Sequence, residues 1–407
     1  MATPAEIDEQ VKLERLQISQ GIEQLRKNTK QLEQKTYASA TIYGITSIDT
    51  LLPLVIKKIE DTNNRIKEGK TGRDFKEINQ YLSPLEPLAA ATIALKITFD
   101  KVFTTKRGSN QLATLCESIG RAIEDELQMR HYENNAPALL QTLKNNYWHR
   151  AIGTKQKIVV IQTLMNRYNV PPWKTWTPTN RVKLGAWLLD CIITTSNWFY
   201  KNMKQEGRKR VNYILPTPEF MEIKEQVIKD SEMFAPLAWP MLIEPNDWTT
   251  ERAGGYLLNE VMRGHDMVRR GDHSSIQGEN PYKFLNKIQK VGFKINLFNF
   301  NVAEWLESKG RSVGKFIPVL DLPLPTKPFD IADNKDSRKA YRRAAAEVMN
   351  TNANAFRRSC RTRMTMDAAR RFRWHKRWFI PWSFDYRGRA YPIPAFLTPQ
   401  DTDFGKS

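Results

Sequence analysis

Apolar residues recur at helical spacing over most of this chain, which predicts a mainly α-helical protein with a few short β elements. The first helix is expected over residues 6–35, because Thr3 and Pro4 form a typical helix start. Its apolar stripe comprises Val11, Ile18, Ile22, Leu25 and Leu32. The Gln, Lys and Glu residues between them predict a solvated face.

Further helices follow from the same spacing. They are expected at about residues 50–68, 75–82, 85–104, 110–131, 135–149, 154–168, 180–200 and 281–307. A basic β-hairpin is predicted at residues 201–216, which have a central glycine and β-compatible flanks. Residues 235–280 are rich in Pro, Gly and Trp and are expected to be irregular.

A proline-rich segment divides the pattern. Pro318, Pro323, Pro325 and Pro328 exclude a helix or a central strand, so residues 318–334 are the best candidate for a domain linker. The sequence after it is rich in Ala and Arg and is helical by propensity. An Asn-rich stretch at 350–354 predicts a break between two helices there.

Charge changes the picture after this linker. The chain carries 63 Lys and Arg against 44 Asp and Glu, a net charge of +19. Residues 335–389 alone hold 16 Lys or Arg and 4 Asp or Glu. Arg dominates, and its guanidinium binds phosphate in a bidentate manner. Nucleic acid is therefore favoured over a solvated helix surface or an anionic membrane, since no coherent apolar face opposes the charge.

Metal, disulfide and membrane chemistry find little support. Cys116, Cys191 and Cys360 lie far apart, which argues against a zinc site or a disulfide framework and fits a reducing compartment. The start of the sequence lacks the apolar core of a secretory signal, and no run of about 18 apolar residues predicts a membrane span. Asp401 and Asp403 form a DxD pair in a polar loop, which we interpret as structural.

The densest chemistry lies in WFIPWSFDYRGRAYPIP, residues 378–394. Gly388, between Arg387 and Arg389, permits close approach of a ligand, and Asp385 can hold one arginine by a charge-assisted bond. Tyr386 and Tyr391 are candidates for stacking on a base or sugar; the alternative is a tight turn with a surface ion pair.

FDYRGRAYPIPAFLTPQ resembles a motif of the single-subunit, bacteriophage-type DNA-directed RNA polymerases. Three more segments resemble the same family and occur in its order: SIGRAIEDE (118–126), WTTERAGGY (248–256) and AYRRAAAEV (340–348). The resemblance covers nearly the whole chain. It implies a phage-encoded protein in the cytoplasm of an infected bacterium.

The resemblance also implies a division of the chain. Residues 1–317 would form an N-terminal domain that binds the promoter and opens the strands. Residues 318–334 would be a linker, 335–377 the basic thumb helices, and 378–407 the start of the palm. The catalytic aspartates of the family lie in the remaining palm, so this chain alone is expected to be inactive. Magnesium and nucleoside triphosphates would belong to the complete enzyme.

Site residues follow from the same resemblance. Asp385, Arg387, Gly388, Arg389 and Tyr391 would contact the template or the template–RNA hybrid. Promoter DNA would meet a loop and the basic hairpin, through Lys67, Lys70, Arg73, Arg208 and Arg210. The hairpin tip offers no clear apolar wedge for separating strands. Thumb contacts to phosphate would come from Arg357, Arg361, Arg370 and Arg371. No metal ligand is expected in this chain.

A second hypothesis stays open at this point. The chain could be a non-catalytic helical module that binds DNA or RNA, or one subunit of a split polymerase with a separate C-terminal half.

Overall fold

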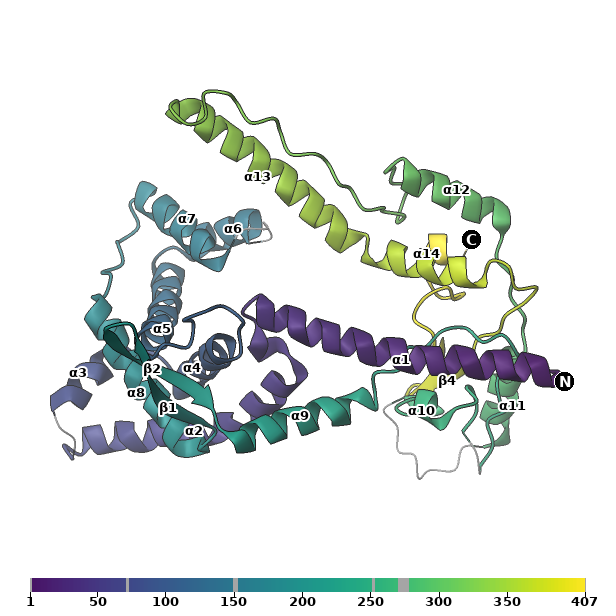
Figure 1. Cartoon of the computed structure of the whole chain (residues 1–407), viewed down its shortest axis with the longest axis horizontal. Helices are drawn as coiled ribbons and strands as arrows, with labels where there is room; N and C mark the ends of the chain where they lie inside the picture. Colours follow the sequence, from purple (N-terminus) through teal and green to yellow (C-terminus); the bar gives the residue numbers. More distant parts are fainter. Residues whose placement is uncertain (1, 71–72, 149–152, 251–252, 270–277, 407) are drawn as a thin grey trace. The chain divides into compact units, whose positions relative to one another are not determined.

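The computed structural model describes residues 2–70, 73–148, 153–250, 253–269 and 278–406, with the side chains of 73–76 and 154–155 excepted. The mainly helical fold with minor β structure that the sequence predicts is confirmed. The chain forms two compact units (Figure 1). Unit 1 comprises Met1–Ile22 and Met233–Ser407, and unit 2 comprises Glu23–Glu232. Helix α1 (Pro4–Gln34) contributes residues to both.

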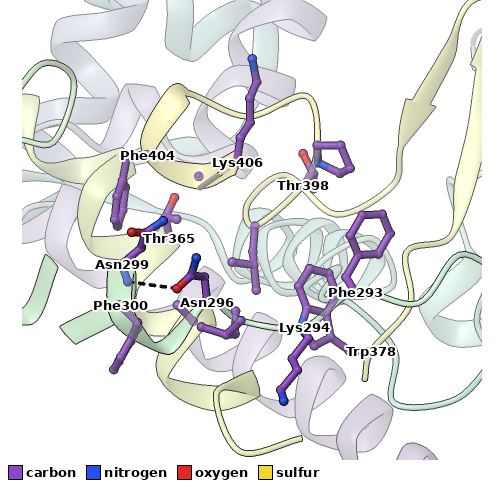
Figure 2. A pocket seen from close by; sticks show the side chains of 15 residues that line it. Phe293, Lys294, Asn296, Asn299, Phe300, Thr365, Trp378, Thr398, Phe404 and Lys406 are labelled. Atoms are coloured by element: carbon purple, nitrogen blue, oxygen red, sulfur yellow. Dashed lines mark hydrogen bonds between the residues drawn. The ribbon is translucent and has the colours of Figure 1, made fainter. Parts of the chain in front are cut away.

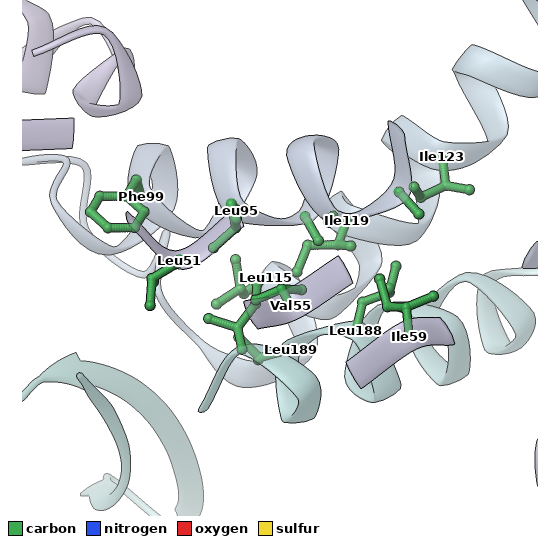
Figure 3. Packing of buried hydrophobic residues seen from close by; sticks show 14 of the residues in the cluster. Leu51, Val55, Ile59, Leu95, Phe99, Leu115, Ile119, Ile123, Leu188 and Leu189 are labelled. Carbon is green, nitrogen blue, oxygen red and sulfur yellow. The ribbon is translucent and has the colours of Figure 1, made fainter. Parts of the chain in front are cut away.

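Unit 2 is a helical assembly that carries one hairpin. Its further elements are η1 (Ala38–Ala40), α2 (Ile42–Lys67), α3 (Arg73–Leu82), α4 (Pro87–Val102), α5 (Leu112–Asn135), α6 (Pro137–Tyr147), α7 (Thr154–Arg167), α8 (Pro178–Ser196), β1 (Phe199–Glu206), β2 (Lys209–Pro216) and α9 (Pro218–Glu232). Strands β1 and β2 pair in antiparallel register, so the predicted hairpin is confirmed. Helices α2, α4, α5 and α8 interleave apolar side chains in one core (Figure 3).

Two glycines let α5 and α8 approach closely. A Cβ on Gly120 would lie 2.1 Å from the carbonyl oxygen of Arg181, and one on Gly185 would lie 1.9 Å from that of Cys116. Each glycine therefore faces the backbone of the opposite helix. Ile119 and Ile123 flank Gly120 and are buried in the core, which explains the SIGRAIEDE segment as a packing motif.

Unit 1 combines helices with a small sheet. Besides the start of α1, its elements are α10 (Asn259–Met262), β3 (Val268–Arg269), α11 (Glu279–Ile288), α12 (Leu297–Ser308), α13 (Lys335–Arg358), α14 (Cys360–Phe372), β4 (Trp382–Asp385), β5 (Ala390–Pro392) and α15 (Asp403–Lys406). The sheet has the order β3-β4-β5, with β3 parallel and β5 antiparallel to β4.

Two helix predictions for unit 1 were wrong in detail. The expected helix at 281–307 is divided into α11 and α12, because Phe293 pairs its backbone N–H and carbonyl with Trp378 instead of with a helical turn. Helix α13 runs through 350–354, and the break lies at Ser359. The side chain of Asn352 bonds the backbone of Leu322 in the proline-rich segment, so it leaves its own helix intact.

The proline-rich segment lies within unit 1 and contains no helix or strand, as its composition predicts. It is tied to α13 through Asn352, and Arg338 donates a hydrogen bond to the carbonyl of Ile331 at 2.9 Å. The functional division into promoter domain, linker, thumb and palm is of a different kind from these compact units and stays a prediction.

Helix α1 corrects the expectation of a solvated polar face. Its predicted apolar stripe is only half-buried, whereas Gln10, Glu14, Gln17 and Gly21 are buried. The side-chain carbonyl of Gln10 accepts from the amide of Leu242 at 2.7 Å. The carboxylate of Glu14 accepts from Leu257 at 3.0 Å and Leu258 at 2.7 Å. Gln10 and Glu14 thus satisfy backbone donors of an irregular segment, which a periodicity argument does not anticipate.

Replacing Gly120 tests the α5–α8 contact. We expect Gly120→Ala to lower the free energy of unfolding by about 2–3 kcal/mol, because the added methyl group overlaps a backbone carbonyl that cannot move aside. Gly153→Ala is the control, since a Cβ there meets nothing within 4 Å, and should cost less than about 1 kcal/mol. Urea unfolding followed by circular dichroism measures both; equal effects would contradict the close-contact account.

Replacing Glu14 tests the buried polar stripe. Glu14→Ala leaves two backbone amides without their acceptor, so we expect a loss of about 2–4 kcal/mol in the free energy of unfolding. Glu9→Ala, at an exposed position of the same helix, should stay within about 0.5 kcal/mol.

The effect of Glu14→Ala on the free energy of unfolding should depend on pH. Burial raises the pKa of Glu14, although hydrogen bonds from Leu257, Gln10 and Leu258 oppose this. A carboxyl group with a higher pKa in the folded state binds more protons there, so its stabilising contribution falls as the pH rises through that interval. The difference between wild type and Glu14→Ala should therefore widen as the pH is lowered from neutral. A difference that shrinks on acidification would contradict this account.

Candidate nucleic-acid interface

The DYRGR segment forms the turn between β4 and β5. The amide of Gly388 donates to the carbonyl of Asp385 at 3.0 Å, and the amide of Asp385 donates to the carbonyl of Arg389 at 2.8 Å. Gly388 has φ +76°, in the left-handed region that glycine adopts without strain, and a Cβ there would meet nothing within 4 Å. The turn therefore requires glycine for its backbone conformation, and its outer side is open.

Asp385 organises this turn. One carboxylate oxygen accepts the amides of Arg387 and Arg389, each at 2.9 Å, and the other pairs with the Arg389 guanidinium at 2.8 Å. Partial burial works to raise the pKa of Asp385, but these hydrogen bonds outweigh it and lower that pKa. The predicted Asp–Arg bond is confirmed, and its partner is Arg389.

Arg387 has a different environment. Its guanidinium lies 5.1 Å from the ring of the exposed Tyr386, and it has no ion pair with any described residue. The ring of Tyr391, in contrast, lies 5.7 Å from the guanidinium of Arg269 and 5.7 Å from that of Arg389. The turn thus presents Arg387, which has no ion pair with a described residue, beside the exposed ring of Tyr386.

Arg269 supports the β4–β5 hairpin, a role that the sequence did not predict. Its Nε donates to the hydroxyl of Ser383 at 2.8 Å, and its terminal nitrogen donates to the carbonyl of Pro392 at 2.7 Å. It therefore bridges β4 and β5. Burial lowers the pKa of Arg269, with Tyr391 and Asp385 opposing this change. Nothing local marks this residue, because only the parallel pairing of β3 with β4 brings it to the turn.

A second support of the hairpin comes from the WTTERAGGY segment, of which residues 251–252 lie outside the described part of the chain. Trp248 is buried, and its indole N–H donates to the carbonyl of Trp382 in β4 at 3.0 Å. A Cβ on Gly254 would lie 2.5 Å from the ring of Trp248, so this glycine makes room for the indole. The segment thus fixes the start of the strand that carries the turn.

The arginines of α13 and α14 differ in whether their guanidiniums have a partner within the protein. Arg361 pairs with Asp401 at 2.6 Å, and Arg370 pairs with Glu304 at 3.3 Å and also with Glu307. The Arg371 guanidinium stacks 3.9 Å from the ring of Trp239. These three predicted phosphate contacts on α14 have internal partners, and their role toward phosphate stays a prediction.

Helix α13 carries exposed arginines that have no ion pair with a described residue. Only Ala345 and Ala355 of its 24 residues are buried. Arg342, Arg343 and Arg358 are exposed and have no ion pair with a described residue. Arg357 is exposed and bonds the side-chain oxygen of Asn354 on its own helix at 2.5 Å. A phosphate backbone would therefore meet α13 more readily than α14.

The predicted promoter contacts lie in unit 2. Lys67 ends α2, and the exposed Lys70 pairs with Glu68 at 2.8 Å. Arg73 begins α3, but its side chain lies outside the described residues. Arg208 and Arg210 are exposed at the hairpin tip.

The two carboxylates of the DxD pair diverge. Asp401 is buried, pairs with Arg361 and accepts the amide of Thr402 at 2.6 Å, whereas the side chain of Asp403 is 93% exposed. Among the residues that the structure describes, no group of three or more His, Cys, Asp or Glu side chains could hold a metal ion. Asp401 therefore acts as a structural anchor for α14.

A cavity of about 150 Å³ lies between α12, α14 and the 397–406 segment (Figure 2). Phe293 stacks on Trp378 in its wall, with ring centres 5.2 Å apart. The other apolar lining includes Phe300, Leu397 and Phe404. Lys294 and Lys406 also line the cavity, so it has cationic as well as apolar walls.

Comparison with known proteins decides the family. A sequence profile of the family described as DNA-directed RNA polymerase N-terminal matches residues 9–274. The chain belongs to this family. Its similarity to T7 RNA polymerase of Escherichia phage T7 is 26% identity over 382 residues, covering 88% of this chain and 42% of the relative.

Two further relatives show the breadth of this polymerase family. The DNA-directed RNA polymerase of Enterobacteria phage T3 is 24% identical over 349 residues, covering 80% of this chain and 38% of the relative. The mitochondrial DNA-directed RNA polymerase 1 of Arabidopsis thaliana is 25% identical over 395 residues, covering 83% of this chain and 39% of the relative. The chain thus spans about two fifths of the length of these polymerases and corresponds to their N-terminal region. No helix of its described part is long and apolar enough to span a bilayer.

Arg269 provides a test of how the hairpin is supported. Arg269→Lys retains a cation but cannot reach Ser383 and Pro392 together, so we expect a loss of about 1–2 kcal/mol in the free energy of unfolding. Hydrogen exchange should accelerate at residues 382–392 more than elsewhere in unit 1. Arg263→Lys, at an exposed position, is the matched control. Unchanged exchange in the hairpin would refute the bridging role.

Proposed function

We propose that this chain is the N-terminal part of a polymerase that synthesises RNA on a DNA template, and that it binds promoter DNA, template DNA and the RNA transcript. The family membership and the similarity to phage polymerases support this assignment. The observation that carries the site assignment is Arg387, a cation that has no ion pair with a described residue and lies on a hydrogen-bonded turn. A polymerase encoded by a phage would act in the cytoplasm of its bacterial host.

The turn would bind the sugar–phosphate backbone of the template–RNA hybrid. Arg387 would donate to a phosphate, with Tyr386 beside it for stacking, and the open side of Gly388 would admit the backbone. Asp385 and Arg389 neutralise each other and fix the turn. Tyr391, whose ring lies 5.7 Å from the guanidiniums of Arg269 and of Arg389, would lie beside the template base. Preorganisation of this kind lowers the entropy that is lost on binding.

The basic surfaces would hold the rest of the nucleic acid. The exposed arginines of α13 would follow phosphates of the hybrid, and Lys67, Lys70, Arg208 and Arg210 would contact promoter DNA. Cations suit the narrow minor groove of A/T-rich DNA because the negative potential is enhanced there.

Magnesium and nucleoside triphosphates would be bound by other residues of the complete enzyme. The described carboxylates do not fit a magnesium site: both oxygens of Asp385 accept bonds within the turn, Asp401 is paired with Arg361, and Asp403 stands apart. We therefore propose no chemical step for this chain alone.

The salt dependence of binding tests Arg387. The logarithm of the affinity for a template–RNA hybrid should fall linearly with the logarithm of the salt concentration, and Arg387→Ala should reduce this slope by about one. Arg15→Ala, an exposed arginine of α1, should leave the slope unchanged. Equal slopes for wild type and Arg387→Ala would remove Arg387 from the interface. RNA synthesis by this chain alone would contradict the placement of catalysis elsewhere.

A further inference from the structure

A groove of about 920 Å³ in unit 2 has a chemistry unlike the rest of the chain. It lies where the end of α3, the start of α4, helix α5 and the segment before α8 meet. Its lining comprises Gln80, Tyr81, Pro84, Glu86, Glu126, Leu127, Arg130, His131, Glu133, Asn134, Trp173 and Trp176. Neither the promoter contacts nor the hybrid contacts proposed above use these residues.

One wall of the groove is aromatic. Tyr81 meets Trp176 edge to face with ring centres 4.8 Å apart, and the rings of Trp173 and Trp176 lie 6.4 Å apart. His131 continues the row, with its ring 5.7 Å from Trp173. These rings are only partly buried, so their remaining faces line the groove.

A buried carboxylate fixes this wall. Glu124 accepts the indole N–H of Trp173 at 3.3 Å and the backbone amide of Trp176 at 2.7 Å. It also pairs with Arg181 at 2.5 Å, with both side chains at least nine-tenths buried. Residues 170–177 contain no helix or strand, and these bonds hold their aromatic residues against α5. The wall is therefore already shaped before anything binds.

The charge of the groove opposes that of the chain. Three carboxylates, Glu86, Glu126 and Glu133, face one guanidinium, Arg130, which pairs with Glu126 at 3.0 Å. Glu86 and Glu133 are exposed and have no ion pair with a described residue. In a chain of net charge +19, this leaves a locally negative groove. A phosphate backbone would be repelled here, so nucleic acid is disfavoured.

We propose that the groove binds an extended, positively charged segment of a partner protein, rich in proline and in arginine or lysine. Proline-rich segments fit grooves lined by Trp and Tyr because their extended conformation is preformed and loses little entropy on binding. Cationic side chains would pair with Glu86 and Glu133 and lie over the indole faces. The inference stands independently of the function proposed above, since it uses other residues of another surface.

Peptide binding tests the proposal. The probe is a fluorescein-labelled peptide of alternating proline and arginine, compared by fluorescence anisotropy with a proline–glutamate peptide and a glycine–arginine peptide of the same length. We expect the full chain to bind the proline–arginine peptide, to ignore the proline–glutamate peptide, and to bind the glycine–arginine peptide at least about threefold more weakly.

Charge reversal locates the binding site. The double variant Glu86→Lys/Glu133→Lys should weaken binding of the proline–arginine peptide by about tenfold or more. The control is Glu219→Lys/Glu222→Lys, which makes the same change of charge at exposed positions of α9. Glu219, like Glu86, lies at the N-terminal end of a helix. It should change the affinity by less than about twofold. Circular dichroism checks that both variants fold.

Three results would overturn the proposal. Equal weakening by both double variants would mean that the peptide responds only to overall charge. Equal binding of the proline–arginine and glycine–arginine peptides would exclude recognition by the aromatic wall. Absence of peptide binding, together with self-association that only the groove variant abolishes, would assign the groove to a second copy of this chain.

Discussion

This structure depends on hydrogen bonds from backbone amides of irregular segments to a few carboxylates. Glu14 binds the amides of Leu257 and Leu258, and Glu124 binds that of Trp176. Asp385 organises its own turn in the same way. Segments without regular structure leave donors unsatisfied, and a buried donor without a partner costs about 1–3 kcal/mol. Each carboxylate thus supplies an acceptor to such donors and at the same time fixes the position of a loop.

This principle explains how the turn from Asp385 to Arg389 can leave the Arg387 guanidinium without an ion pair to a described residue. Its internal bonds occupy Asp385 and Arg389, while Arg269 and Trp248 fix the strands behind it. Arg387 is left outside this network. A cation held on a fixed backbone loses less entropy on meeting a phosphate than one on a mobile loop, which supports the proposed contact with a nucleic-acid backbone.

The two proposed binding surfaces differ in charge, and each charge favours a different class of ligand. Helix α13 buries only two of its residues and carries exposed arginines that have no ion pair with a described residue, which suits a polyanion. The groove of unit 2 carries carboxylates beside aromatic rings, which suits a cationic peptide. The exposed Glu86 and Glu133 keep this groove locally negative in a chain that is otherwise strongly basic.

The sequence by itself determined the helical class, the β1–β2 hairpin, the Asp–Arg bond of the turn and, through its motifs, the polymerase family. These features depend on local periodicity, turn chemistry and short-range spacing, which the chain encodes over a few residues. Only the tertiary structure decided that Gln10 and Glu14 face inward, that α13 continues through its asparagines, and that Arg269 bridges the hairpin. In each case the partner is a backbone group distant in sequence, such as that of Leu242, Leu322 or Pro392, and no local pattern specifies it.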